Sequence, residues 1–364
     1  MIFIAKLARV LIIPSFIGSL LGCGSVISNY ADLDRPSPTL GQGEAYSSNN
    51  PAGQPSDTGR SVGSEGSIIK ATDGGTKGVP QKSGITGQLD SVYFTDANNG
   101  WAVGTNGIII RTSDGGATWI AQTSGITEGL KSVFFIDPNI GWAVGGAGTI
   151  LMTSDGGVTW NPQTSGTRQW IRGVFFANRD IGWVAGTAGT ILKTSDGGEN
   201  WIPQKTGITT GFTNIFFIDS NIGWTVGSSG TVLKTTDGGA NWVSHSTGAH
   251  VRLNGLFFLD KNIGWVIGAT GTILKTRDGG LTWNPQKSWT NEPLDGIYFV
   301  DKDSGWVVGS DALILRTRDG GLTWEPKKLA AKTWYKALSF ANTQRGWGVK
   351  AIRCWGDDWF FIAN

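Results

Sequence analysis

Four short runs of apolar residues recur along most of the chain, and glycine, asparagine, aspartate or serine separates each run from the next. In the first complete copy the runs are Ser91–Phe94, Trp101–Val103, Ile108–Thr112 and Thr118–Gln122. Runs of this length bounded by turn residues are typical of β-strands. The first run is apolar on both faces, as expected of a strand covered by neighbouring sheets. Since no sustained helical periodicity follows residue 22, the pattern predicts an all-β chain of four-stranded units.

The four-strand unit repeats every 41 residues without insertion or deletion. Gly-Trp pairs and a phenylalanine keep this step, and Asp-Gly-Gly does so seven times, beginning at Asp73, Asp114, Asp155, Asp196, Asp237, Asp278 and Asp319. Four strands in about 40 residues is the period of a β-propeller blade. The spacing therefore predicts a propeller over residues 61–349.

The two ends of the repeat region each hold only part of a repeat. Residues 62–83 carry its second half and residues 337–349 carry its first half. Six whole repeats and two halves make seven blades, with a ring closed by the N- and C-terminal half-repeats. Closure of this kind also pairs strand edges that would otherwise be open to aggregation.

The first 22 residues are typical of a lipoprotein signal peptide. Lys6 and Arg9 precede the apolar run Val10–Leu21, which is too short to span a bilayer as a stable helix. The run ends in Leu-Leu-Gly-Cys, which resembles the lipobox of bacterial lipoproteins, and the resemblance implies that Cys23 carries the lipid. We therefore expect an extracytoplasmic protein anchored to a membrane by lipid, on the periplasmic or thylakoid-lumen side or at an outer membrane. An ordinary signal peptide is the alternative.

Two further segments lie outside the repeats. Residues 23–60 are rich in Ser, Pro, Gly and Asn, which favours a flexible tether behind the lipidated cysteine. Residues 350–364 form a C-terminal tail with the lone thiol of Cys354 and four large aromatic side chains. The tail either caps the last blade or offers an apolar patch to a partner, and both interpretations stay open.

Composition narrows the classes of function. The 364 residues include 56 glycines, 18 tryptophans and 2 cysteines, so no disulfide framework can form. There are 30 basic and 28 acidic residues, and removal of Lys6 and Arg9 leaves 28 of each. This neutral balance argues against a nucleic-acid partner, whose binding face would be basic. Thirteen tryptophans fall in two repeat positions, where we expect them to pack between blades.

The motif Thr-x-Asp-Gly-Gly-x-x-Trp resembles the aspartate box, or BNR repeat, of sialidases and other propellers. A short carboxylate can accept hydrogen bonds from the backbone of a tight hairpin, and glycine supplies its positive φ. Because the aspartate recurs seven times at one spacing, we interpret it as structural rather than catalytic.

A column of cationic residues lies on the third strand of the repeat. We expect a rim of solvated cations there, which could touch anionic surfaces. Its members are Lys70, Arg111, Lys193, Lys234, Lys275 and Arg316.

A repeat protein does its specific work where its repeats differ. The most variable connection runs from the fourth strand of one blade to the first strand of the next, and opens on the top face of a propeller. Tryptophan and arginine outside packing positions are typical of binding hot spots, although ordinary exposed loop side chains are the alternative. The candidate binding residues are Arg168, Trp170, Arg172, His250, Arg252, Lys332, Trp334, Tyr335 and Lys336.

Catalysis has little support in the sequence. The only histidines are His245 and His250, and no Ser-His-Asp or metal-ligand spacing can be assembled. A glycosidase pair could be drawn from Glu128, Glu292, Asp295 and Asp311, or a sialidase-like arginine trio from Arg168, Arg172 and Arg252. Nothing selects among them. We therefore expect no catalytic residue, no metal and no cofactor, with a glycoside hydrolase as an alternative function.

Taken together, the 41-residue blades, Gly-Trp-x-x-Gly, Thr-x-Asp-Gly-Gly-x-x-Trp and the split closing blade resemble the photosystem II assembly and stability factors over residues 62–349. The resemblance implies a non-enzymatic, extracytoplasmic, seven-bladed scaffold without a cofactor that binds newly made reaction-centre protein D1. We expect a monomer with a protein partner. An envelope or surface adhesion propeller of a non-photosynthetic bacterium remains an alternative.

Overall fold

The computed structural model describes residues 59–62, 66, 68–72, 77–310, 313–328 and 336–340. The chain divides into two units, Met1–Thr39 and Leu40–Asn364, and every described residue belongs to the second. The predicted signal peptide, Cys23 and the C-terminal tail from residue 350 lie outside the described residues. No helix in the described part is long and apolar enough to cross a membrane.

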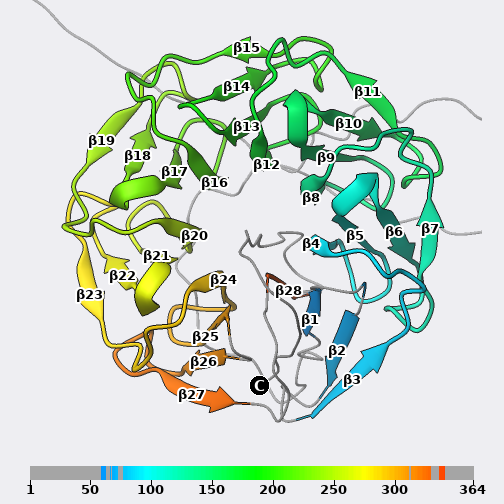
Figure 1. Cartoon of the computed structure of the whole chain (residues 1–364). Coiled ribbons are helices and arrows are strands. Elements are labelled where there is room, and N and C mark those ends of the chain that lie inside the picture. The colour runs from blue at the N-terminus through cyan, green and yellow to red at the C-terminus, as the bar shows by residue number, and fades with distance from the viewer. Residues whose placement is uncertain are drawn as a thin grey trace, which may run out of the picture. The chain divides into compact units, whose positions relative to one another are not determined.

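The described residues form seven four-stranded antiparallel sheets, which follow one another around a ring (Figure 1). Each of the six complete repeats forms one sheet, and its first strand lies innermost. The prediction of an all-β propeller with four-stranded antiparallel blades is confirmed. The only helical elements described are single 3-10 turns between the second and third strands: η3 (Thr105–Gly107), η4 (Gly146–Gly148), η5 (Ser228–Gly230) and η6 (Ala269–Gly271).

The strands of the six complete repeats are short and keep the same order from the centre outward. The first three sheets contain β4 (Leu89–Phe94), β5 (Gly100–Gly104), β6 (Ile109–Thr112) and β7 (Ile120–Gln122); β8 (Leu130–Phe135), β9 (Gly141–Gly145), β10 (Ile150–Thr153) and β11 (Asn161–Gln163); and β12 (Ile171–Phe176), β13 (Gly182–Gly186), β14 (Ile191–Thr194) and β15 (Ile202–Pro203). The next three contain β16 (Phe212–Phe217), β17 (Gly223–Gly227), β18 (Val232–Thr235) and β19 (Val243–His245); β20 (Leu253–Phe258), β21 (Gly264–Gly268), β22 (Ile273–Thr276) and β23 (Asn284–Gln286); and β24 (Leu294–Phe299), β25 (Gly305–Gly309), β26 (Leu313–Thr317) and β27 (Glu325–Lys328).

The remaining sheet joins the two ends of the repeat region. Its order is β28 (Ala337–Phe340), β1 (Gly59–Val62), β2 (Ile68–Thr72) and β3 (Lys77–Gln81), and β1 pairs with β28 antiparallel. Three strands of this sheet therefore come from the N-terminal end of the repeat region and one comes from the C-terminal end, whereas the sequence predicted half a blade from each end. Gly59 and Arg60, the last residues of the predicted tether, belong to β1.

Aromatic side chains fill the space between neighbouring sheets. Trp101 on β5 is fully buried and stacks on Phe135 of the next sheet, with ring centroids 3.6 Å apart. Its Nε1 donates a hydrogen bond to the Gly156 carbonyl oxygen of that sheet at 2.8 Å. On the outer side, the Trp160 ring lies perpendicular to the Phe135 ring, with ring centroids 5.9 Å apart. This arrangement repeats around the ring, so the core consists of the interfaces between blades.

The cationic column on the third strand is not the solvated rim that the sequence suggested. Lys193 Nζ lies 5.5 Å from the centre of the Trp183 ring, and Lys275 Nζ lies 4.7 Å from that of Trp265. Lys275 is only 6% exposed and donates a hydrogen bond to the Gly320 carbonyl oxygen of the next sheet. In the six complete repeats the cations pack on tryptophan because the neighbouring strand places an indole beside each of them. Lys70, in the sheet that joins the chain ends, lies opposite Arg60 instead.

Candidate functional site

The innermost strand of each complete repeat has a β-bulge at its second residue. In β4, Leu89 pairs with Gly104 and Ser91 pairs with Val103, so Asp90 is left between two partners. The same offset recurs in β8, β12, β16, β20 and β24. A bulge bends the strand and re-aims a side chain. The bulged residues are the variable polar column of the sequence: Asp90, Lys131, Arg172, Thr213, Asn254 and Asp295.

On one side of the ring the bulged residues form a buried ion pair. Lys131 Nζ lies 2.7 Å from Asp90 Oδ2, and both side chains are less than a tenth exposed. Gln88 donates a hydrogen bond to the other carboxylate oxygen of Asp90 at 2.7 Å. Lys336, which precedes β28, is also buried and lies 3.7 Å from that oxygen. Charges from three consecutive sheets therefore meet at Asp90.

On the other side the bulged residues are linked by hydrogen bonds from uncharged side chains. Thr213 donates to the Leu253 carbonyl oxygen at 2.6 Å, across to the next sheet. Asn254 in turn donates to the Leu294 carbonyl oxygen at 2.9 Å and to Asp295 Oδ1 at 3.0 Å. Each sheet is thus tied to its neighbour through a residue that differs from blade to blade.

Asp295 is a fully buried acid on the innermost strand β24. Burial raises the pKa of its carboxyl well above the usual range, against the opposing charges of Lys336 and Arg252. Asp295 Oδ2 and the Nε and Nη2 atoms of Arg252 are buried without a hydrogen-bond partner in the described part of the chain. Asp295 and Arg252 can therefore each make hydrogen bonds beyond those that the described residues provide.

The predicted binding residues lie in different environments. Arg168 and His250 are exposed, Arg172 and Arg252 are half-buried, and Lys336 is buried beside Asp90. Lys332, Trp334 and Tyr335 lie outside the described residues.

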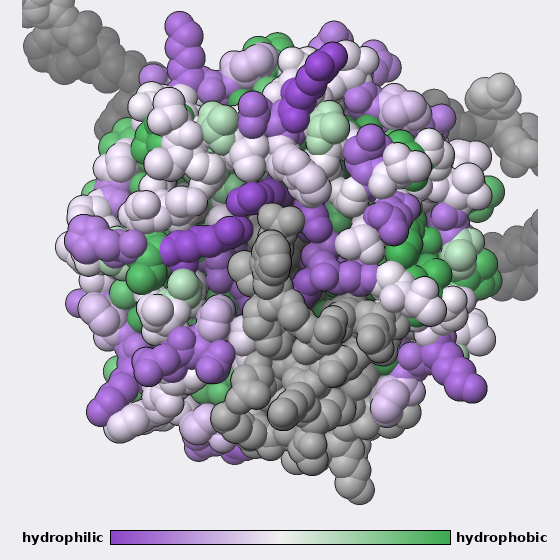
Figure 2. All heavy atoms as spheres, viewed as in Figure 1, coloured by the Kyte–Doolittle hydropathy of each residue, from purple (hydrophilic) through white to green (hydrophobic). Residues whose placement is uncertain are grey.

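The structure brings Trp170 into contact with the bulged column. Trp170 is 39% exposed, and Lys131 Nζ lies 5.7 Å from the centre of its ring. Trp170 comes just before β12, whose bulge is Arg172. Figure 2 shows hydrophilic side chains gathered around the middle of the face that Figure 1 presents. An exposed indole beside a cation, two residues before the arginine bulge of β12, is suited to binding a protein segment.

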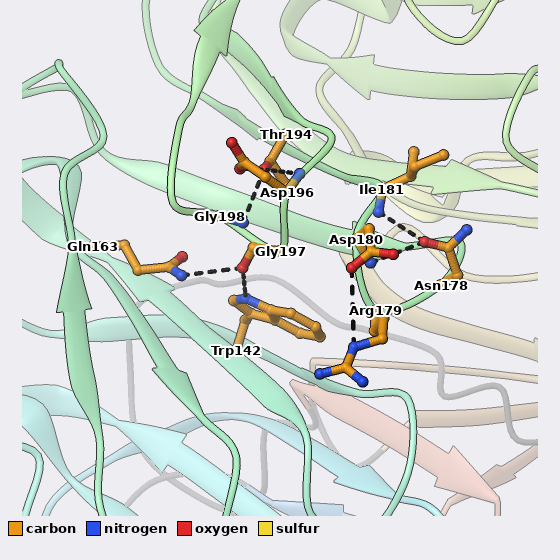
Figure 3. A network of polar contacts seen from close by, with 10 residues as sticks. All are labelled: Trp142, Gln163, Asn178, Arg179, Asp180, Ile181, Thr194, Asp196, Gly197 and Gly198. Carbon is orange, nitrogen blue, oxygen red and sulfur yellow. Dashed lines mark hydrogen bonds and ion pairs between the residues drawn. The ribbon is translucent and has the colours of Figure 1, made fainter. Parts of the chain in front are cut away.

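The aspartate-box carboxylates are used within their own hairpins. Figure 3 shows that Thr194 donates a hydrogen bond to Asp196 Oδ1, at 2.8 Å, and that the Gly198 amide donates to the Thr194 hydroxyl. The other oxygen of Asp196 accepts from Asn200 at 2.8 Å. The hydrogen bonds from Asn200 hold the pKa of Asp196 at about 2. Asp73 lies outside the described residues.

The same hairpins connect neighbouring blades. The Gly197 carbonyl oxygen accepts hydrogen bonds from Trp142 Nε1 and from Gln163 Nε2, each at 3.1 Å, and both donors come from the preceding sheet (Figure 3). Since the box supplies a backbone acceptor to the Gly-Trp tryptophan, the two repeated motifs form one interface.

The metal-ligand and carboxylate sites that the sequence raised can be compared with the structure. The described part of the chain contains no group of three or more His, Cys, Asp or Glu side chains that could hold a metal ion. Of the carboxylates considered for a glycosidase pair, Asp295 is fully buried, Glu128 is exposed, and Asp311 lies outside the described residues.

One exposed residue, Trp289, was missed by the sequence analysis. It is 67% exposed and has a φ of 61°, and the five preceding repeats have glycine at its position. Lys287 Nζ lies 3.6 Å from the centre of its ring, beside a hollow of about 510 Å³. A comparison of the glycine column across repeats would have found it.

Comparison with protein-family models gives a match to the family described as "Photosynthesis system II assembly factor YCF48". The matched residues are 125–206, 163–247, 203–285 and 287–350, which together cover more than half of the chain. A search of curated proteins gave no match.

Several solved structures have a similar fold. A "YCF48 bound to D1 peptide" is 24% identical, with a TM-score of 0.57 over 65% of this chain and 80% of that chain. YCF48 from Cyanidioschyzon merolae is 19% identical, with a TM-score of 0.57 over 72% and 94%. An ancestral GH74 enzyme is 15% identical, with a TM-score of 0.53 over 69% and 39%. At these identities the likeness shows the propeller fold alone.

Proposed function

Because the chain belongs to the photosynthesis system II assembly factor YCF48 family, we propose that it is a protein-binding propeller that takes part in photosystem II assembly. Its partner in this proposal is the reaction-centre protein D1, since one YCF48 of similar fold is described as bound to a D1 peptide. The proposal includes no cofactor and no catalytic step.

The observation that carries the proposal is where the repeats differ. The Gly-Trp and aspartate-box positions are nearly constant and are used between blades, whereas the bulged residues change from blade to blade. Trp170, Lys131 and Arg172 come from adjacent blades and combine an aromatic face with positive charge. Side chains of this kind contribute most of the energy in protein interfaces.

Three finer features belong to the same proposal. The ring has seven blades and acts as a monomer. Cys23 carries a lipid that holds the propeller at an extracytoplasmic membrane surface, where a newly inserted membrane protein exposes its segments. The resemblance of residues 20–23 to a lipobox supports this location.

The test is binding of the purified protein to labelled peptides that tile the exposed segments of D1, measured by fluorescence anisotropy. Arg172→Ala and Trp170→Ala are expected to weaken binding of one peptide by about tenfold or more. Arg179→Ala is the matched control, because Arg179 follows the other end of β12 and its side chain is 68% exposed. Its affinity should equal that of the unchanged protein.

Two outcomes would overturn the proposal. If no D1 peptide binds at all, D1 is not the partner. If the Arg172 and Arg179 variants lose affinity equally, the effect is one of general charge, and the inner end of β12 is not the site.

A further inference from the structure

Trp289 has a backbone conformation that its type of side chain rarely adopts. Its φ of 61° lies in the left-handed region, which is unfavourable for a bulky residue. The five preceding repeats have glycine at this position, with φ between 68° and 72°: Gly84, Gly125, Gly166, Gly207 and Gly248. A non-glycine residue held in this region is strained, and such strain is concentrated at functional sites.

The strain is not explained by packing. A Cβ atom built on any of these five glycines would meet no atom within 4 Å, so the position faces open space. Trp289 is accordingly 67% exposed, the most exposed aromatic side chain among the large hydrophobic residues of the described part. A tryptophan that is strained and yet uncovered has an unused apolar surface.

The ammonium group of Lys287 holds this ring in place. Its Nζ lies 3.6 Å from the ring centre, which is within the range of a cation–π contact. Within the described residues, no carboxylate lies at ion-pair distance from Lys287. The pair therefore presents an aromatic face beside a positive charge that can still bind an anion.

Three polar groups beside the pair, Gln286 Oε1 and the Ser288 and Thr290 hydroxyls, already take part in hydrogen bonds. Gln286 Oε1 accepts a hydrogen bond from Trp324 Nε1 at 3.1 Å, and Ser288 donates to the Thr290 carbonyl oxygen at 3.3 Å. The Thr290 hydroxyl accepts from the Glu292 amide at 3.0 Å. Both hydroxyl groups of the lining are thus bonded within the loop, while no described carboxylate neutralises Lys287, so the charge favours an acidic peptide over an uncharged glycan. The exposed indole and the Lys287 ammonium remain available, and they match an apolar side chain next to a carboxylate.

We propose that Trp289 and Lys287 form a second docking site of the propeller, for an acidic peptide segment of a protein partner. An apolar side chain of the segment stacks on the indole, and a neighbouring Asp or Glu pairs with Lys287. The site lies between β23 and β24, in a different inter-blade connection from Trp170. The inference rests on the proposed function only in that the partner is a protein.

The test uses the full chain and two short fluorescein-labelled peptides that differ only in charge, one of Glu, Leu and Ser and one of Lys, Leu and Ser. Anisotropy titration should show that the acidic peptide binds more tightly. Trp289→Gly restores the residue of the other repeats, so it should fold normally and lose about tenfold or more in affinity for the acidic peptide. Lys287→Glu should reverse the preference between the two peptides.

The repeats supply a matched control. Lys205 occupies the position of Lys287 two blades earlier and is exposed, but Gly207 stands where Trp289 does. Lys205→Glu makes the same change in net charge without touching an aromatic ring, so it should leave the affinity unchanged. Equal losses in the Lys205 and Lys287 variants would reduce the effect to overall charge and overturn the proposal.

Failure of this inference can be told apart from failure of the proposed function. If D1 peptides bind through Trp170 and Arg172 while Trp289→Gly binds the acidic peptide as the unchanged protein does, the second site is refuted and the assembly function stands. If no D1 peptide binds but the acidic peptide requires Trp289, the second site stands and the partner is another protein.

Discussion

Arg60 donates hydrogen bonds from Nε and Nη2 to the Gly115 carbonyl oxygen, at 3.3 and 3.0 Å. Forty-one residues later, Trp101 Nε1 makes the corresponding bond to Gly156. Arg60 also lies over the Phe94 ring, with Cζ 4.0 Å from its centre, as Trp101 lies on Phe135. A planar guanidinium can both stack and donate, so arginine replaces tryptophan in the sheet that joins the chain ends.

This relationship predicts the effect of two substitutions at Arg60. Arg60→Ala leaves the buried Gly115 carbonyl without its donors and should lower the free energy of unfolding by about 1.5–3 kcal/mol. Arg60→Trp supplies the ring and the N–H of the other blades and should recover most of that loss. Urea unfolding monitored by circular dichroism measures both. Equal losses in the two variants would show that the guanidinium charge, and not its shape, is required.

The buried Asp90–Lys131 ion pair predicts that two substitutions will not be additive. Lys131→Met removes the nearer of the two buried cations at Asp90 and leaves only Lys336 at 3.7 Å and Gln88. It should cost about 3 kcal/mol of stability, because breaking a buried ion pair leaves the remaining charge poorly compensated. Combined with Asp90→Asn, the total loss should fall short of the sum by about 1–3 kcal/mol. A double-mutant cycle from urea unfolding gives this coupling energy directly. Simple additivity would mean that Lys131 acts through its stem alone.

The aspartate boxes predict a dependence of stability on acid. The hydrogen bonds from Thr159 hold the pKa of Asp155 at about 2, below its ordinary value of 3.8. Between these two values the unfolded chain binds more protons than the folded chain, so stability falls as the pH falls through this window. Above about pH 4 the full contribution of the carboxylate is present.

Asp155→Asn isolates this contribution. The difference in unfolding free energy between the unchanged protein and the variant should be constant above about pH 4 and shrink as the pH approaches 2. Urea titrations across this range measure it. A difference that stays the same throughout would show that the hairpin does not depend on the charge of Asp155.

Much of the fold could be predicted because its determinants are local and repeated. The sequence around Asp155 is a hairpin signal by itself, and the Gly-Trp pair at Trp142 marks a strand. Identical spacing then predicts that the strands and turns of one blade recur in the next. The contact between Trp142 and the aspartate box of the following blade connects the two motifs, but either could be recognised alone.

The site was less predictable because it depends on contacts between blades. The bulge at Asp90 is an offset between two strands, and a hydrophobic pattern read along one strand does not contain it. Lys275 looked like a solvated cation because the Trp265 ring lies on another strand and the Gly320 carbonyl group lies in a turn of the next sheet. Trp289 is a different case. The sequence shows that it replaces the glycine of the other repeats, but only the structure shows that it has a positive φ and is exposed.

The strain at Trp289 makes a prediction about stability that does not involve any partner. Trp289→Gly removes a backbone cost of about 1–3 kcal/mol and gives up a cation–π contact with Lys287 worth about 0.5–1 kcal/mol. The balance favours glycine, so the free energy of unfolding should rise by about 1 kcal/mol. Gly207→Trp makes the reverse change where Lys205 is available, and it should destabilise the protein by a similar amount.

Urea unfolding of the two variants separates the possible roles of the tryptophan. A gain in stability for Trp289→Gly and a loss for Gly207→Trp would mean that the chain keeps Trp289 at a cost to its own fold, as expected of a side chain retained for binding. A clear loss for Trp289→Gly would instead make the indole a packing residue. The strain would then be compensated within the fold, and the argument for a docking site at Trp289 would lose its basis.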